Sequence, residues 1–571
     1  MNSRAQRWQD LKDNPSPSVL IVGAGINGIG TFRDLALQGT DVVMVDRGDY
    51  CSGASAASSH MVHGGIRYLE NGEFSLVREA VRERNQLIEY VPHQVDPLPT
   101  TFPIFKIFSG LLNAPLKFLG LLDKPSERGA LVIKLGMVFY DAFTREQKTV
   151  PPHQFRSRSQ ALAKVPDLNP EIRYTATYYD GSMESPERIA IELILDGVEA
   201  NPLALPLNYV SLVSARGKEV VVKNEVSGEE ITLTPGVIVN AAGPWIDFVN
   251  QKMGCKTPYI SGTKGSHVIL DNPQLVNAIG GHEFFFENKD GRIVLIFPLR
   301  DKVMIGSTDI RIDHPDDAVI TEAEVDYFFE MIKRVFPEIE VNRSQIIYTF
   351  SGVRPLQRTS GGATGQISRN HTVEELKPGE LMDVPVLSLV GGKWTSFRAF
   401  SEHAADDVLR LLGGERKIST WNLPIGGSRG YPASPEERDL LLRKWSEGAD
   451  LDLPLVELLF ERYGTKTARL TASYKDKLLP LKTIPDITLG ELEWILKEED
   501  IQHLDDLVLR RTTLAKLGKI SAESLSEVAG ICAAVLGWSE EQTNAEINRY
   551  QEIALREHRL NYAKYIPQEG V

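Results

Sequence analysis

The chain has 571 residues, 42% of them hydrophobic and 25% charged, which is the composition of a globular protein with room for about three or four domains. Its 77 acidic residues exceed its 63 basic residues and give a net charge of −14, so we expect no nucleic-acid partner. The first residues are polar and no run of about 18 apolar residues occurs. This predicts a protein that is neither exported through an apolar signal peptide nor membrane-spanning.

The three cysteines form no recognisable pattern. Cys51, Cys255 and Cys532 lie more than 200 residues apart, so their spacing provides neither a metal-binding motif nor a disulfide framework. We therefore predict reduced, cytoplasm-facing chemistry and no metal site.

The first elements in chain order predict a βαβ unit. Ser18 to Val22 is a short apolar run, the segment ending at Leu37 has helical spacing, and Val42 to Val45 is a second β-branched run. A strand, a helix and a strand in this order predict an open, doubly wound parallel sheet.

A glycine-rich loop joins the first strand to its helix. Gly23, Gly25 and Gly28 fit the pattern G-x-G-x-x-G, in which the glycines permit a tight turn, the approach of a pyrophosphate and close helix packing. The N-terminus of the helix then faces the anion. Asp46 ends the second strand, where its carboxylate can accept a hydrogen bond from a ribose 2′-hydroxyl, and this disfavours NADP. The loop therefore predicts a dinucleotide site for NAD or FAD.

Later segments indicate further domains. Tyr209 to Asn240 predicts an antiparallel meander that leads into another buried strand, so the dinucleotide-binding domain is predicted to be discontinuous. Arg292 to Phe297 and Val303 to Gly306 predict strands of a sheet that covers the substrate. After Trp421 the pattern becomes helical, and residues from about 425 onward predict a separate all-helical domain.

The segment after the second strand, Ser55 to Leu69, is small and polar and places a histidine before two glycines, which lets the backbone approach a flat ring. With this segment the sequence resembles the FAD-dependent glycerol-3-phosphate dehydrogenases. The motifs that carry the resemblance run in order through nearly the whole chain: GAGINGIG (23–30), SSHMVHGGIRYLE (58–70), NAAGPWID (240–247), KGSH (264–267), IGSTD (305–309), SGVRPL (351–356), SRNH (368–371), GGKWTSFR (391–398) and DDLVLRRT (505–512).

The resemblance implies an α/β fold with a discontinuous Rossmann-like FAD-binding domain, an inserted mixed α/β substrate domain and a C-terminal all-helical domain. The expected division is 17–100, 201–255 and 376–420 for the three parts of the FAD-binding domain, 101–200 for the substrate-domain segments, 256–375 for the substrate-binding sheet, and 425–571 for the helical domain.

The activity that the resemblance implies is oxidation of sn-glycerol 3-phosphate to dihydroxyacetone phosphate. A hydride would pass from C2 to flavin N5, and the electrons would pass on to a quinone. Four cations lie inside the matching motifs, and guanidinium groups suit phosphate. We expect Arg67, Arg369 and Lys393, with Tyr68, near the phosphate group and Arg354 near the reacting hydroxyl group.

His63 is the expected general base, because a neutral imidazole can accept the hydroxyl proton as the hydride leaves. The alternative is that His63 only hydrogen-bonds to the flavin or packs against it. His267 is a second candidate for the site, and His60 is expected to be structural. The residues expected to bind FAD are Gly23, Gly25, Gly28, Asp46, Ser58, Ser59, Gly64, Gly243, Gly392 and Thr395.

Two segments depart from the family pattern. Glu184 to Ile189 replaces the usual D-A-R-L-type segment, which leaves its role open. Residues 97–122 are longer and more apolar than the usual proline-rich loop, with Lys106 and Lys117 as their charges. They predict either a surface that lies among lipid headgroups or a buried loop or homodimer contact. We expect a cytoplasmic protein attached peripherally to the cytoplasmic face of a membrane.

Two other functions stay open at this point. An oxidase that uses molecular oxygen differs from a quinone-linked enzyme in the shape of its cavity, which the sequence does not determine. A catalytically silent flavin-binding sensor or scaffold, with its helical tail docking a partner, would be favoured by loss of the base or the cations. His63, Arg354, Arg369 and Lys393 are all present.

Overall fold

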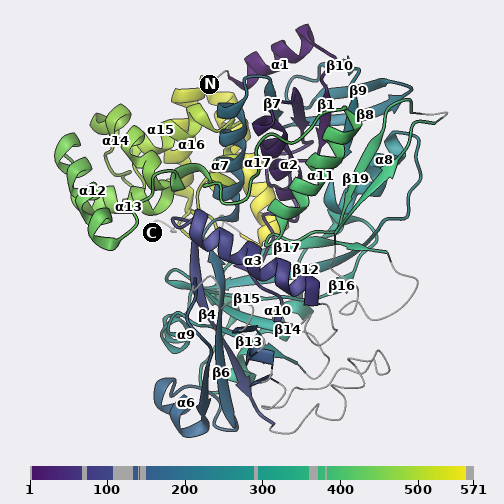
Figure 1. The fold of residues 1–571 in the computed structure, drawn as a ribbon. Coiled ribbons are helices and arrows are strands. Elements are labelled where there is room, and N and C mark those ends of the chain that lie inside the picture. The colour runs from purple at the N-terminus through teal and green to yellow at the C-terminus, as the bar shows by residue number, and fades with distance from the viewer. Residues whose placement is uncertain are drawn as a thin grey trace, which may run out of the picture.

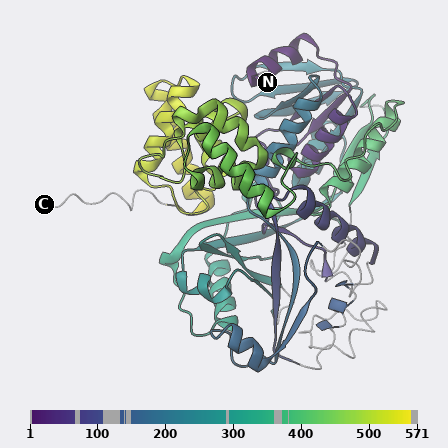
Figure 2. The same cartoon turned by 60° about the vertical axis from the view of Figure 1, so that its left-hand side comes forward.

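The computed structural model describes residues 3–66, 74–106, 133–134, 136–138, 140–141, 149–288, 293–358, 371–379 and 382–560. Three parts can be distinguished in Figure 1: a parallel sheet with its flanking elements, a larger mixed sheet below it, and a helical unit formed by residues 435–558. Figure 2 shows the helical unit, coloured green to yellow, beside the parallel-sheet part.

The parallel sheet is built from three separate stretches of the chain. β1 lies between β2 and β11, and neighbouring strands are parallel except for β18 and β19. Because both faces of the sheet are covered, β1 and β11 are buried at every position, as is typical of parallel sheets. In the described part of the chain the strand order is β18 (Thr372–Leu376), β19 (Val386–Val390), β11 (Val237–Asn240), β1 (Val19–Val22), β2 (Val42–Val45) and β7 (Ala204–Leu207).

The two faces of this sheet have different covers. Val19 and Ile21 of β1 pack with three helices, whereas Leu20 and Val22 pack with a small antiparallel sheet and the N-terminal helix. The helices are α2 (Ile26–Leu37), α7 (Pro186–Ala200) and α11 (Phe397–Leu411), and the other cover consists of α1 (Arg4–Asp13), β8 (Val210–Arg216), β9 (Glu219–Asn224), β10 (Glu230–Leu233) and α8 (Ile246–Lys252). This architecture confirms the predicted discontinuous, doubly wound α/β fold.

The larger mixed sheet is mostly antiparallel. Its strands in order are β16 (Ile310–Arg311), β12 (Ile260–Leu270), β15 (Lys302–Gly306), β14 (Ile293–Leu299), β13 (Glu283–Glu287), β4 (Val95–Ile104), β6 (Tyr174–Met183) and β3 (Met61–Val62), with β17 (Ile346–Gln357) paired to β12 and β5 (Gln154–Ser157) paired to β6. Four helices accompany the sheet: α3 (Phe74–Tyr90), α6 (Arg158–Lys164), α9 (Pro273–Ile279) and α10 (Glu322–Val335). The residue limits assigned to the domains from the sequence stay predictions.

The helical unit covers one face of the mixed sheet. Phe297 and Met304 pack with residues of the helical unit, whereas their neighbours Ile296 and Val303 pack with α9 and α10 on the opposite face. The unit contains α12 (Pro435–Ala449), α13 (Leu453–Tyr463), α14 (Thr467–Tyr474), α15 (Leu489–Glu498), a π-helical turn at Asp506–Arg511, α16 (Ala522–Leu536) and α17 (Glu540–His558). Among all helices in the described ranges, none combines the length and apolarity that a bilayer span needs.

The apolar segment 97–122 is not one surface loop. Residues 97–104 belong to β4, in which Leu98, Phe102 and Ile104 are buried. Phe105 packs against the core that contains α10. The prediction of a membrane-facing surface is wrong for these residues, because their apolar side chains are buried inside the protein. Composition does not separate the two alternatives, since a buried strand and an apolar surface are equally rich in apolar residues. Residues 107–122 lie outside the described residues.

Candidate active site

A cavity of about 1170 Å³ lies where the parallel sheet, the mixed sheet and the helical unit meet. Its lining includes the carboxyl ends of β1 and β2, where ligands bind in doubly wound sheets. The lining also includes His63 and Arg354, which lies on β17. The glycine-rich loop and the candidate catalytic residues therefore share one cavity.

The glycine-rich loop has the geometry that its pattern predicts. Gly23 has a φ of +109°, and a Cβ atom there would lie 2.7 Å from the carbonyl carbon of Ala241. A Cβ atom on Gly28 would overlap the carbonyl oxygen of Gly23, so only glycine lets α2 pack this close to the end of β1. Gly25 lines the cavity at the N-terminus of α2. The helix therefore presents its first turn to the cavity, as an anion site requires.

Asp46 follows β2 and lines the same cavity. Its carboxylate oxygens accept hydrogen bonds from the backbone N–H groups of Ala24, at 2.6 Å, and Gly48, at 2.9 Å. Burial of the charge raises the pKa of Asp46 from 3.8 to about 6, because these two donors offset only part of the lost solvation. A carboxylate oxygen can accept a second hydrogen bond, so Asp46 is able to bind a ribose hydroxyl group.

Two further positions suit a flat, extended cofactor. Oδ1 of Asn27, in the first turn of α2, is buried and has no hydrogen-bond partner among the described residues. Gly243 follows β11 with a φ of +54°, and no described atom lies within 4 Å of the place its Cβ would take. A buried acceptor beside the loop and an open approach to the backbone both fit a cofactor lying along the cavity.

The turn between β19 and α11 closes this part of the cavity. Gly392 has a φ of +94°, and a Cβ atom there would lie 2.7 Å from Nδ2 of Asn27, so glycine keeps the turn against the glycine-rich loop. Oγ1 of the buried Thr395 accepts a hydrogen bond from the backbone N–H of His63 at 3.0 Å. Lys393 of the same turn lines the cavity. This turn therefore connects the glycine-rich loop to the candidate base.

Ser59 and His267 lie at the boundary between the two sheets. Oγ of Ser59 is 2.8 Å from Nε2 of His267, whose ring stacks on Phe350 with centroids 4.6 Å apart. Burial, with Arg354 nearby, lowers the pKa of His267 to about 3, so its ring is neutral at physiological pH. Nδ1 of this ring has no hydrogen-bond partner within the described ranges. A neutral ring with one unpaired nitrogen is able to contact a substrate hydroxyl group.

Arg354 lies on β17 and lines the cavity. Its guanidinium group donates to Oγ of Ser307 at 2.7 Å and to the carbonyl oxygen of Thr308 at 3.0 Å. It also lies 3.4 Å from a carboxylate oxygen of Asp309. Three acceptors of the IGSTD motif therefore fix the orientation of this arginine, which suits recognition of a polar substrate.

Gly64 is placed differently from the prediction. A Cβ atom there would lie 2.7 Å from Cγ2 of Val81 and would overlap the hydroxyl group of Tyr140, so this glycine serves packing within the protein. Gly65 lines the cavity instead, as does Ser58. Three predicted residues, Arg67, Tyr68 and Arg369, lie outside the described residues, and their contacts with phosphate stay predictions.

A buried polar cluster at the cavity was missed by the sequence analysis. Asp180 on β6 accepts hydrogen bonds from the hydroxyl groups of Tyr140, at 2.6 Å, and Tyr178, at 2.9 Å, and from the backbone N–H of Gly64. Arg84 lies 3.3 Å from the same carboxylate. Asp180 and Tyr178 line the cavity. No local motif marks this cluster, because its members come from distant parts of the chain.

The segment that departs from the family pattern docks the helical unit. Glu187 accepts a hydrogen bond from Nζ of Lys516 at 2.6 Å, and Arg188 donates to both carboxylate oxygens of Glu499, at 2.5 and 3.0 Å. Nζ of Lys516 also lies 3.3 Å from Nε2 of His60. Burial and the charge of Lys516 lower the pKa of His60 well below its usual value, which fits a neutral structural histidine.

Comparisons with known proteins agree with this geometry. One family model, described as FAD dependent oxidoreductase, matches residues 18–375, and another, described as C-terminal domain of alpha-glycerophosphate oxidase, matches residues 418–543. A glycerol-3-phosphate dehydrogenase of Synechocystis sp. is 31% identical over 568 residues, which cover 94% of this chain and 96% of that protein. A D-erythritol 1-phosphate dehydrogenase of Brucella abortus is 29% identical over 512 residues, which cover 86% of this chain and 93% of that protein. The chain belongs to the FAD-dependent oxidoreductases and, among them, to the glycerol-3-phosphate dehydrogenase family.

A solved structure has the same fold. It is the glycerol-3-phosphate dehydrogenase from Bacillus halodurans complexed with FAD, which is similar with a TM-score of 0.75 and 21% identity over 98% of both chains. FAD is the cofactor of this chain, and Asn27, Asp46 and Gly243 provide cavity positions that fit it.

Proposed function

We propose that this protein oxidises sn-glycerol 3-phosphate to dihydroxyacetone phosphate. The observation that carries the proposal is that His63, Arg354 and Lys393 line one cavity together with the glycine-rich loop. Bound FAD would supply the hydride acceptor, N5 of its flavin, for the hydrogen on C2 of the substrate. The names of the relatives at 31% and 29% identity support a polyol phosphate as the substrate class.

The proposed site separates the cations that bind phosphate from the arginine at the reacting carbon. We assign Lys393 to the phosphate dianion, together with Arg67, Tyr68 and Arg369, because a dianion is bound best by several cations placed close together. Arg354 is assigned to the C2 hydroxyl group, where Asp309 at 3.4 Å offsets part of its charge. This division lets the phosphate orient the substrate while Arg354 stabilises the oxygen atom that becomes the carbonyl.

His63 accepts the hydroxyl proton in this proposal. Its backbone N–H donates to Thr395, so the turn that carries Lys393 also helps to hold the segment of the base. His267 is less suited to this role, because a ring with a pKa of about 3 binds a proton weakly. We assign His267 to hydrogen bonding with the substrate.

An anaerobic flavin-bleaching titration tests the proposed substrate. sn-Glycerol 3-phosphate should reduce the flavin, whereas glycerol, lactate and amino acids should not. D-erythritol 1-phosphate belongs in the same series, because one relative is named for it. Equal bleaching by glycerol contradicts the proposed phosphate site, and an FAD-loaded protein that no polyol phosphate bleaches favours the silent scaffold.

We also propose that a quinone reoxidises the flavin at the cytoplasmic face of a membrane. The support is residues 107–122, an apolar segment with Lys117 as its single charge. Replacing Phe108, Leu111 and Leu112 by Ser should weaken co-sedimentation with liposomes and lower quinone-dependent turnover. If this variant changes from dimer to monomer in size-exclusion chromatography and still binds liposomes, the segment is a homodimer contact. Reoxidation by molecular oxygen at the rate found with quinone identifies an oxidase.

A further inference from the structure

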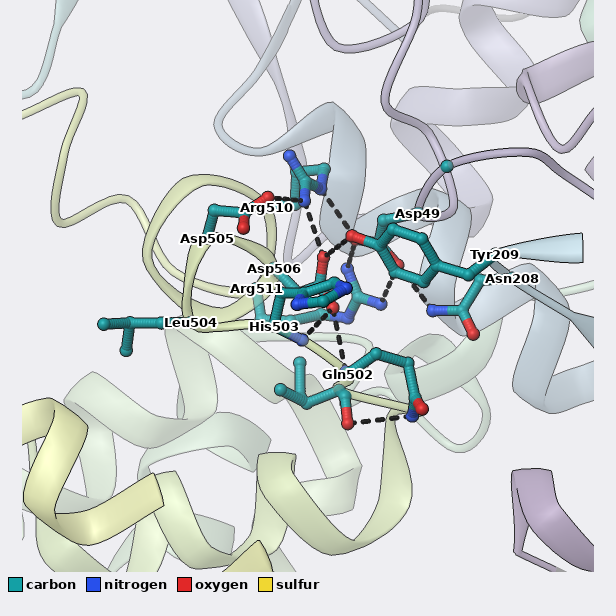
Figure 3. Close-up of polar contacts among 12 residues, drawn as sticks. Asp49, Asn208, Tyr209, Gln502, His503, Leu504, Asp505, Asp506, Arg510 and Arg511 are labelled. Carbon is teal, nitrogen blue, oxygen red and sulfur yellow. Dashed lines mark hydrogen bonds and ion pairs between the residues drawn. The ribbon is translucent and has the colours of Figure 1, made fainter. Parts of the chain in front are cut away.

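A buried group of charges joins the helical unit to the segment that follows Asp46 (Figure 3). Arg511 donates to both carboxylate oxygens of Asp49, at 2.7 and 2.9 Å, and Nε of Arg510 donates to one of them at 2.6 Å. Asn208 adds a further hydrogen bond to Asp49 at 2.9 Å. The side chains of Asp49 and Arg511 are both 0% exposed. Both arginines of the DDLVLRRT motif therefore bind one carboxylate of the parallel-sheet part.

A second carboxylate extends this group toward the cavity. Oδ1 of Asp506 accepts hydrogen bonds from Arg510 and from the hydroxyl group of Tyr209, each at 2.6 Å. Arg510 and Tyr209 both line the cavity. Burial and the neighbouring charge of Asp49 raise the pKa of Asp506 to about 6. Against the effect of burial, the two arginines hold the pKa of Asp49 well below its usual value, so Asp49 is the firmly charged member.

Asp49 is connected to Asp46 through a short, hydrogen-bonded segment. Oδ1 of Asp46 accepts from the N–H of Gly48 at 2.9 Å, and the carbonyl oxygen of Gly48 accepts from the N–H of Tyr209 at 2.8 Å. A displacement of Asp49 therefore moves the backbone that orients Asp46. The residue assigned to the ribose is thus tied to the helical unit through three residues of chain.

We propose that Arg511 is a positioning residue for FAD, so that cofactor binding and docking of the helical unit are coupled through Asp49. Without Arg511, the buried charge of Asp49 would lose its two-bond partner and keep Arg510 and Asn208, an unfavourable arrangement that its segment would relieve by moving. Such coupling is reciprocal: if the docked helical unit favours FAD binding, bound FAD favours docking.

The first test is the affinity of the apoprotein for FAD, titrated by flavin fluorescence. We expect Arg511→Met to raise the Kd by about 5- to 150-fold, the usual range for coupled sites, and Arg511→Lys to recover part of the loss. Asp49→Asn, which keeps the side-chain shape, should also weaken FAD binding, and this variant carries the test if Arg511→Met does not fold.

Arg469→Met is the matched control, since Arg469 pairs with Glu498 inside the helical unit and is 65% exposed. We expect it to change the Kd by less than about twofold. Equal affinity of the Arg511 and Arg469 variants overturns the proposal.

The second test measures the reverse direction by hydrogen–deuterium exchange. In the wild-type protein, FAD should slow amide exchange in residues 46–51 and also in residues 499–512. In Arg511→Met, saturating FAD should slow exchange in residues 46–51 alone. If FAD leaves residues 499–512 of the wild-type protein unchanged, the coupling is absent and the proposal fails. Neither test needs turnover, so both are independent of the proposed substrate.

Discussion

A Cβ atom on Gly265 would overlap Nη2 of Arg354 and would lie 2.6 Å from Cζ of its guanidinium group. The two residues belong to β12 and β17, which pair so that Gly265 lies opposite Gly352 and Thr263 opposite Arg354. The space for this arginine is therefore provided by a glycine of the neighbouring strand.

Gly265→Ala should displace Arg354 from Ser307 and Thr308. We expect kcat/KM for sn-glycerol 3-phosphate to fall by about 10- to 100-fold, which is the loss of one charge-assisted hydrogen bond, with the FAD content unchanged. Gly448→Ala is the control, because Gly448 lies in α12, no described atom approaches its Cβ position within 4 Å, and alanine favours a helix. If Gly265→Ala is as active as this control, Arg354 does not need the space beside Gly265.

FAD affinity should decrease as the pH falls through about 6. Asp46 accepts hydrogen bonds as a carboxylate, and its pKa of about 6 means that protonation removes an acceptor within an accessible pH range. Below that pKa the Kd should rise, by at most about tenfold per pH unit. Fluorescence titrations between about pH 5.5 and 8 measure the effect. Asp46→Asn should bind FAD more weakly than the wild-type protein at the upper end of this pH range, and its Kd should not change with pH. A wild-type Kd that does not change with pH would exclude Asp46 from the ribose site.

His63→Asn should retain FAD and slow anaerobic flavin reduction by roughly 10²- to 10⁴-fold, the usual contribution of a positioned base. The pH dependence of the reduction rate should lose one ionisation in the variant. His403→Asn is the control, because His403 is 56% exposed on α11. If stopped-flow measurements show that the flavin of His63→Asn is reduced at the wild-type rate, His63 only packs against the flavin. His267 would then be tested as the general base.

Lys516→Met should lower both thermal stability and the rate of flavin reduction. It leaves Glu187 buried without its cation, and it removes the donor to His60, which lies three residues before His63. We expect the rate to fall about tenfold through misplacement of the base. Combining it with Glu187→Gln should restore the melting temperature without restoring the rate.

The control for this prediction is Lys519→Met, which breaks the more exposed ion pair between Lys519 and Asp486. A double variant that recovers the rate together with stability shows that Lys516 has no role in placing the base.

The parts of the fold that the sequence predicted are those determined by local pattern. β1, α2 and β2 follow from hydrophobic period and from the glycines between them, and Asp46 follows from its position after β2. The segment 97–104 is misinterpreted from the sequence because alternation and composition do not distinguish a buried strand inside a mixed sheet from an apolar surface, and its three prolines argue against a strand.

The contacts between distant segments could not be predicted in this way. Asp49 and Arg511 are 462 residues apart, and nothing in either local sequence identifies the other. The motif assigns Gly64 to the flavin, whereas its neighbours Val81 and Tyr140 come from other parts of the chain. Such pairings depend on the assembled fold, so a single sequence contains no signal for them.

The strand order of the parallel sheet also determines when the cofactor site can form during translation. β19 follows β1 by more than 360 residues and pairs with β11. At about 5 to 20 residues per second, the ribosome needs roughly 20 to 70 s to synthesise that interval. From the synthesis of β11 until that of β19, β11 has an unpaired edge, the kind of surface that chaperones protect from aggregation. Lys393 and Thr395 emerge still later, so the nascent chain completes its flavin site only after both sheets have been synthesised.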